Sequence, residues 1–140
     1  MARTLRLFVY GTLQPQLGTP MGAWIAARLV RCAEPASVSG HLHAIRAGAG
    51  WFPALVPGCG PRRVAGTLCE LRLEPGALAV LGRYEGREYR RVAMPVRTAS
   101  GRRVRAQVYV WRTALPAEAR HVAGGDFRAW LRIRRLGAFS

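Results

Sequence analysis

The sequence contains no lysine, and acidic residues are scarce: 7 aspartates and glutamates stand against 22 arginines. The formal net charge is therefore +15. Such an excess is typical of proteins that bind nucleic acid, but here the arginines are spread along the whole chain and no RNA- or DNA-binding motif accompanies them. We expect an arginine-covered surface with weak, salt-sensitive attraction to polyanions and no specific nucleic-acid partner.

Cysteine and histidine are also rare, and neither is spaced for metal binding. The three cysteines form no C-x-x-C pair, and their odd number argues against a disulfide framework. The three histidines show no zinc-ligand spacing, so we expect no metal site. The residues concerned are Cys32, Cys59, Cys69, His41, His43 and His121.

Long hydrophobic runs are absent as well. No segment approaches the ~18 apolar residues that a membrane span needs. The apolar run at residues 7–10 is too short for a signal peptide and lacks a small-residue cleavage site. We therefore expect a cytoplasmic protein that does not enter a membrane. We treat residues 1–140 as one domain, because that length suffices for a single hydrophobic core.

Short alternating patterns predict several strands. The best of them cover residues 5–10, 63–73, 89–96 and 103–111, and the last two are close enough to form an antiparallel hairpin. Residues 30–42 are also predicted to be extended. Prolines at positions 53 and 57 restrict residues 51–58 to an edge strand or a short piece, and residues 47–50 form a flexible connection.

Capping residues predict short helices between these strands. Thr19 followed by proline predicts a helix start, Gly86 a helix end, and Asp126 the start of a last helix. Two further helix starts are predicted, one after Glu74 and one at residues 115–116. Strands and helices together predict an α+β fold, with short helices flanking a strongly curved sheet or a small barrel.

One of the seven acidic residues stands out. Six have ordinary explanations as residues of helix starts, a cap, a bend, a strand or a solvated loop. These six are Glu34, Glu70, Glu74, Glu88, Glu118 and Asp126. The seventh, Glu85, lies between a tyrosine and a glycine at a helix-to-strand junction. It is the candidate for proton transfer, although a solvated turn glutamate would have the same neighbours.

Four arginines flank Glu85 along the sequence. They are Arg83, Arg87, Arg90 and Arg91. A guanidinium group next to a carboxyl group lowers its pKa, whereas burial raises it. Proton transfer at Glu85 therefore requires these arginines to point to solvent, and Arg91 is the one in doubt because it shares a strand face with Tyr89.

The sequence LFVYGTL at residues 7–13 ends a buried strand on a glycine and a hydroxyl group. Glycine lets a ligand approach the backbone N–H groups closely, and Thr12 adds its hydroxyl group. This turn is suited to bind a carboxylate. A plain strand-exit turn would have the same sequence, so the turn alone does not identify a site.

Several motifs follow one another in a fixed order: LFVYGTL at 7–13, FPALVPG at 52–58, VAGTLCEL at 64–71, LGRYEG at 81–86, YRR at 89–91 and AQVYVW at 106–111. In this order they resemble the γ-glutamylcyclotransferase-like family, also called the AIG2-like family. The resemblance covers residues 5–112, and GDFRAWL at 125–131 is similar to the end of small bacterial members. It implies an α+β fold with a small mixed β-barrel and flanking short helices.

The resemblance also implies an activity. The α-amine of a γ-glutamyl amine or peptide attacks its own γ-carbonyl group, which releases 5-oxoproline and a free amine without any cofactor. The family's acid–base glutamate matches Glu85, and a pocket tyrosine matches Tyr89 at a shorter spacing. The substrate-binding turn matches Tyr10, Gly11, Thr12 and Leu13. The expected partner is thus a small-molecule γ-glutamyl substrate.

Two other classes of function stay open at this point. One is a non-catalytic, small-molecule-binding member of the same fold, because a fold does not determine an activity. The other is an arginine-rich nucleic-acid binder. Neither the leaving amine nor the oligomeric state follows from the sequence.

Overall fold

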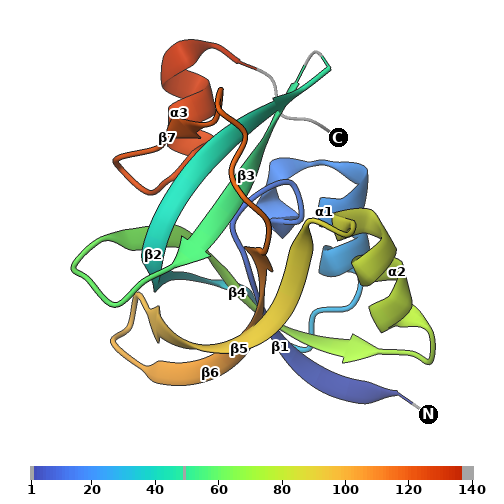
Figure 1. Cartoon of the computed structure of the whole chain (residues 1–140). Coiled ribbons are helices and arrows are strands. Elements are labelled where there is room, and N and C mark those ends of the chain that lie inside the picture. The colour runs from blue at the N-terminus through green and yellow to red at the C-terminus, as the bar shows by residue number, and fades with distance from the viewer. Residues whose placement is uncertain (1, 49, 137–140) are drawn as a thin grey trace.

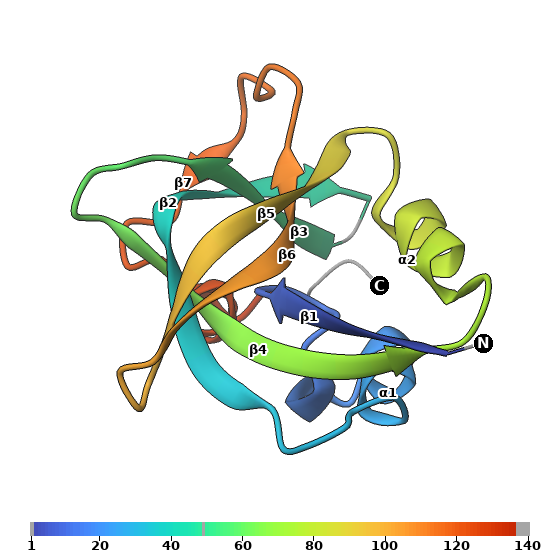
Figure 2. The same cartoon turned by 90° about the horizontal axis from the view of Figure 1, so that it is seen from below.

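Five strands close into a small mixed β-barrel (Figure 1; Figure 2). The computed structural model describes residues 2–48 and 50–136. The barrel strands are β1 (Arg3–Val9), β2 (Glu34–Ala47), β4 (Arg63–Leu73), β5 (Tyr89–Thr98) and β6 (Arg103–Trp111). They follow the order β2-β4-β1-β6-β5, and pairing of β5 with β2 closes the barrel. Only the β1–β6 pair is parallel among these five, so the predicted mixed barrel is confirmed.

The long strand β2 belongs to two sheets. Its first half pairs with β4 and β5 in the barrel, and its second half pairs with β3 (Gly50–Pro57) and β7 (Arg120–His121). The predicted extended segment thus starts later, at Glu34, and runs further, to Ala47. As its prolines predict, β3 is an edge strand, since β2 is the strand it pairs with in the described part of the chain. The flexible connection is predicted at 47–50, where Ala47 of β2 pairs with Gly50 of β3; residue 49 lies outside the described residues.

Three short α-helices flank the barrel, with α1 (Pro20–Ala26) and α2 (Ala77–Glu85) on one side and α3 (Phe127–Arg134) on the other (Figure 1). The predicted caps are confirmed, since Thr19 accepts a hydrogen bond from the Gly22 N–H and Asp126 from the Ala129 N–H. Gly86 ends α2 with a φ of 92°, which favours glycine. A one-turn 3-10 helix, η1 (Pro15–Leu17), precedes α1.

The prediction that a helix starts at residues 115–116 is wrong. Residues 112–119 contain no helix; they cross from β6 to β7 in a single turn closed by the Ala119 N–H on the Pro116 carbonyl, at 3.0 Å. Because Arg120 and His121 must pair with β2, the connection is too short to hold a helix. Within the described residues, no helix is long and apolar enough to cross a membrane.

Two buried clusters hold the barrel and its helices together. Inside the barrel, strand residues such as Phe8, Val64 and Val108 pack with Phe127 and Trp130 of α3. The second cluster joins the other face of β1 and β4 to α1 and α2, and includes Leu7 and Leu81. Both faces of β1 are therefore covered, which fixes where its carboxyl end emerges.

Gly66 allows β4 to approach β1 closely. A Cβ atom built at this position would lie 2.3 Å from the Val9 carbonyl oxygen and 2.7 Å from the Phe8 ring. Neither neighbour can retreat, because Phe8 and Val9 are both buried. The glycine thus sets the path of β1 just before the turn at residues 10–13.

We expect Gly66→Ala to destabilise the fold by about 1–3 kcal/mol, because the added methyl group overpacks the β1–β4 contact. Gly82→Ala is the matched control, since nothing lies within 4 Å of a Cβ atom there. That helical position should gain up to about 1 kcal/mol from the substitution. Urea unfolding of both variants measures the difference, and equal stabilities would contradict this account of Gly66.

Candidate functional site

A cavity of about 220 Å³ opens where β1 ends. It is formed by the end of β1 and the following turn, by β3, by the end of α2 and the start of β5, and by β6. Its lining comprises Phe8, Val9, Tyr10, Gly11, Thr12, Leu13, Phe52, Pro53, Tyr84, Glu85, Glu88, Tyr89 and Tyr109. All four tyrosines of the chain are in this set, and no arginine is, although the chain has 22 basic residues.

The turn predicted to bind substrate forms one wall of the cavity. Its side chains are almost fully buried, and the Gln14 N–H closes it by donating to the Gly11 carbonyl, at 3.1 Å. A Cβ atom at Gly11 would lie 2.6 Å from Pro53 Cγ. Glycine is therefore required here by the close packing of β3 against the turn.

Glu85 reaches the same cavity from the end of α2. Burial raises the pKa of its carboxyl group from the ordinary 4.5 to about 8. Among the described residues no arginine forms an ion pair with it. The flanking arginines are exposed, and Arg91 donates a hydrogen bond to Gln107 at 3.0 Å. The structure thus brings Glu85 and the Gly11 turn together without a neutralising cation.

The cavity tyrosines differ in what their hydroxyl groups do. The Tyr10 hydroxyl donates to the Tyr109 carbonyl at 2.5 Å and accepts from the Leu55 N–H at 3.3 Å. The Tyr84 and Thr12 hydroxyl groups are hydrogen-bonded to each other, and the Tyr89 hydroxyl donates a hydrogen bond to the Pro53 carbonyl. These three hydroxyl groups therefore hold the cavity walls.

The Tyr109 hydroxyl is the exception. No residue in the described ranges is hydrogen-bonded to it, although the side chain is only 6% exposed and lines the cavity. It is thus the tyrosine hydroxyl in this set that no hydrogen bond of the wall occupies. The sequence patterns placed Tyr109 only on a strand face and gave no sign of this role. Tyr89, predicted to contribute to the pocket, does lie in its wall, but its hydroxyl is committed to Pro53.

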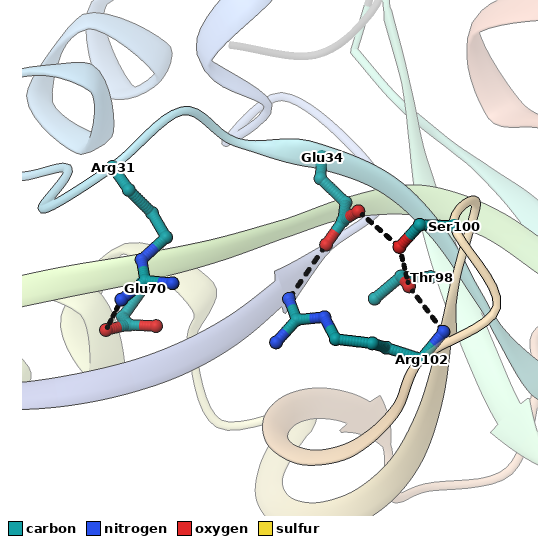
Figure 3. A network of polar contacts seen from close by, with 6 residues as sticks. All are labelled: Arg31, Glu34, Glu70, Thr98, Ser100 and Arg102. Atoms are coloured by element: carbon teal, nitrogen blue, oxygen red, sulfur yellow. Dashed lines mark hydrogen bonds and ion pairs between the residues drawn. The ribbon is translucent and has the colours of Figure 1, made fainter.

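Three of the six other acidic residues form ion pairs away from the cavity. Glu34 accepts from Arg102 at 2.9 Å and from Ser100 at 3.1 Å, and Glu70 faces Arg31 at 3.5 Å (Figure 3). Arg102 holds the pKa of Glu34 below its ordinary value. Glu74 pairs with Arg28 at 2.7 Å. These ion pairs lie outside the cavity and do not involve its two carboxyl groups, those of Glu85 and Glu88.

Glu88 is a second cavity residue whose position the sequence did not reveal. The prediction of a solvated loop residue is right about its exposure, but Glu88 also lines the cavity, three residues after Glu85. The turn at Gly86 between α2 and β5 brings it back to the rim. Only the three-dimensional path of this turn could have shown that.

The histidines come together without forming a metal site. His43 and His121 pair across β2 and β7, with ring centroids 5.2 Å apart, and His41 lies 6.0 Å from His121. Within residues 2–48 and 50–136, no group of three or more histidine, cysteine or acidic side chains is arranged to hold a metal ion.

Comparison with known proteins bears on both the fold and the family. A family model described as γ-glutamyl cyclotransferase, AIG2-like matches residues 7–129, which extends the resemblance into α3. No curated protein matches the chain. Among solved structures, an AIG2-like protein from Mus musculus is 25% identical, with a TM-score of 0.59 and 81% of each chain covered.

Two further structures share the fold at lower identity. YkqA from Bacillus subtilis is 21% identical with a TM-score of 0.68; the match covers 95% of this chain but only 43% of YkqA, so the chain spans less than half of that protein. A structure described as γ-glutamyl cyclotransferase is 13% identical with a TM-score of 0.62, over 99% of this chain and 90% of that one. On the family match, this chain belongs to the γ-glutamyl cyclotransferase, AIG2-like family.

Proposed function

We propose that the protein is a cyclotransferase that converts a γ-glutamyl amine or peptide into 5-oxoproline and a free amine. The observation that carries the proposal is the placement of Glu85, free of ion pairs within the described residues, in one small cavity with the Gly11 turn. Family membership supports a cyclotransferase kind of chemistry. The roles assigned below to individual residues belong to the proposal.

The reaction needs one base and one acid. The substrate's α-ammonium loses a proton to Glu85, and the amine attacks the γ-carbonyl carbon to form the lactam C–N bond. The attacking nitrogen, now bonded to that carbon, loses its second excess proton to water. The bond from the carbon to the leaving nitrogen breaks as Glu85 returns its proton to the leaving nitrogen, so that a lactam with one N–H and a free amine result. Because nucleophile and electrophile belong to the same molecule, the site mainly has to hold the substrate in the geometry of attack.

The raised pKa of Glu85 suits a group that must both take and give a proton near neutral pH. In the empty cavity the protonated carboxylic acid is favoured by burial. A substrate ammonium beside it lowers the pKa again, since opposite charges stabilise each other where little water is present. Substrate binding would thus create the carboxylate that acts as the base.

The remaining polar groups of the cavity would hold the substrate. No arginine lines the cavity, so the substrate's α-carboxylate must be bound by uncharged donors such as the backbone N–H groups of Gly11 and Thr12. The Tyr109 hydroxyl is free to donate to the γ-carbonyl oxygen, where negative charge develops during attack. Tyr10, Leu13 and Tyr89 shape the walls.

We expect Glu85→Gln to lower kcat by about 10²–10⁴-fold, because positioned proton transfer is lost. Binding should persist, since the amide keeps the shape of the carboxyl group. Release of 5-oxoproline from a panel of γ-glutamyl amines and amino acids measures turnover, and calorimetry measures binding. Turnover at the parental rate would refute the role given to Glu85.

We expect Thr12→Ala to raise KM by about three- to tenfold with a smaller effect on kcat, because one hydrogen-bonding group of the substrate turn is removed. Thr113→Ala, at an exposed position outside the cavity, is the control. Steady-state kinetics of both variants measures KM and kcat. If Thr12→Ala and Thr113→Ala behave alike, Thr12 does not contact the substrate.

The pKa of Glu85 also predicts how stability depends on pH. Between its ordinary value of 4.5 and about 8, the unfolded chain releases a proton that the folded protein retains. The contribution of Glu85 to stability must therefore fall as pH rises through this window and then level off. Glu85→Gln should remove that fall and leave the variant more stable than the parent above pH 8, as urea unfolding at several pH values can show. A parallel pH dependence of the two proteins would contradict the burial of the carboxyl group.

The alternative is a ligand-binding protein of this family that does not turn its ligand over. The same panel of γ-glutamyl compounds separates the two. Binding without release of 5-oxoproline by the parent protein would favour the alternative.

A further inference from the structure

A second hollow, of about 570 Å³, lies beyond the substrate turn. It is bounded by η1, the start of β2, the middle of β4 and the start of α3. Its lining comprises Gln14, Pro15, Gln16, Ala33, Pro35, Ala36, Ala65, Gly66, Thr67, Asp126 and Arg128. None of these residues lines the cavity that contains Glu85, so the two hollows are separate sites.

Gln14 presents an unused donor group in this hollow. Its side chain is only 3% exposed, and its Oε1 accepts from the Thr67 hydroxyl at 2.9 Å and from Gln16 Nε2 at 3.3 Å. Gln16 Nε2 also donates to the Thr67 hydroxyl, which fixes the orientation of both amides. With its oxygen occupied, Gln14 must turn its NH₂ group away from Thr67.

That NH₂ group has no partner within the described residues. The side-chain atoms there that are both fully buried and unpaired are His43 Nδ1 and Trp130 Nε1, so Gln14 Nε2 keeps contact with the open space of the hollow. A ligand oxygen can replace water as the acceptor for one of these N–H groups. A carboxylate can accept from the amide with one oxygen and leave its second oxygen for another donor.

Two charged side chains complete the hollow, both at the start of α3. Arg128 is partly buried and forms no ion pair in the described ranges. Asp126 uses Oδ1 to cap the helix, at 3.1 Å from the Ala129 N–H, and leaves Oδ2 free. The helix start is held firmly on the barrel, since the Ala65 N–H donates to the Gly125 carbonyl at 2.7 Å.

We propose that this hollow binds a free α-amino acid. The carboxylate is bound by the Gln14 NH₂ group and the Arg128 guanidinium, and the ammonium group by the Asp126 carboxylate. The small apolar residues of the wall, Ala33, Ala36 and Ala65 among them, leave room for a short side chain. This site goes beyond the proposed cyclotransferase reaction and does not depend on it.

The test is a titration of the ¹⁵N-labelled full-length protein with L-alanine, followed by NMR. We expect saturable shifts of the Gln14 side-chain NH₂ and Arg128 Nε–H signals. Arg128→Gln should raise the apparent Kd by about tenfold or more, because a charge-assisted hydrogen bond is lost. Arg132→Gln is the matched control, since Arg132 is an exposed arginine of the same helix outside the hollow.

Further variants and ligands test which groups of the site and of the amino acid are responsible for binding. Gln14→Glu preserves the acceptor for the Thr67 hydroxyl but repels a carboxylate, so this variant should also fail to bind L-alanine. If the Gln14→Glu protein does not fold, the Arg128→Gln protein tests the site by itself. Acetate and ethylamine, each with half of the zwitterion, should bind more weakly than L-alanine. Glu85→Gln protein should bind L-alanine like the parent, which separates this site from the proposed reaction. Absence of saturable shifts, equal binding by the Arg128→Gln and Arg132→Gln proteins, or acetate binding as tightly as L-alanine would each overturn the proposal.

Discussion

A carboxyl group kept away from every guanidinium is the constraint on which the candidate site depends. In a chain with 22 basic and 7 acidic residues arginine partners are abundant, and Glu34, Glu70 and Glu74 each form an ion pair with one. Pairing lowers the pKa of such a group and would leave it a poor proton carrier at neutral pH. Glu85 forms no such pair within the described residues, because its cavity is walled by the Gly11 turn, β3 and the tyrosines, while the neighbouring arginines are exposed. Burial, rather than a charge partner, then sets its pKa.

The walls of this cavity depend on a few close contacts and hydrogen bonds within the barrel. Gly66 lets β4 approach β1, which fixes where the turn begins, and Gly11 lets Pro53 pack onto the turn itself. The Tyr89 hydroxyl holds Pro53 through its carbonyl group, and the Tyr84 hydroxyl holds Thr12. These bonds join protein groups to one another, so they hold the walls of the cavity together, whereas the Tyr109 hydroxyl is hydrogen-bonded to no residue in the described ranges. The start of α3, held on β4 by the Ala65–Gly125 hydrogen bond, forms one side of the second hollow, which Gln14 also lines.

Much of this arrangement could be predicted from the sequence, because local rules coincide with the final fold. The alternating pattern predicted β4 and β6 residue for residue, and Thr19, Gly86 and Asp126 act as the predicted caps. The order of motifs indicated the family and pointed to the turn and Glu85 together. What failed depended on tertiary contacts: the pairing of β7 with β2 removed the helix predicted at 115–116, and the turn at Gly86 returned Glu88 to the cavity rim. The free hydroxyl of Tyr109 and the free amide of Gln14 follow from which neighbours are absent, and no sequence pattern encodes that.

The most direct test of the central claim is a crystal structure of the Glu85→Gln protein with a γ-glutamyl amine bound. The account predicts that the substrate's α-carboxylate accepts hydrogen bonds from the N–H groups of the Gly11 turn. Its α-nitrogen should then lie within hydrogen-bonding distance of the residue 85 side chain, with no arginine between them. A substrate bound elsewhere on the barrel, or one whose carboxylate is held by an arginine and whose α-nitrogen is remote from residue 85, would contradict it.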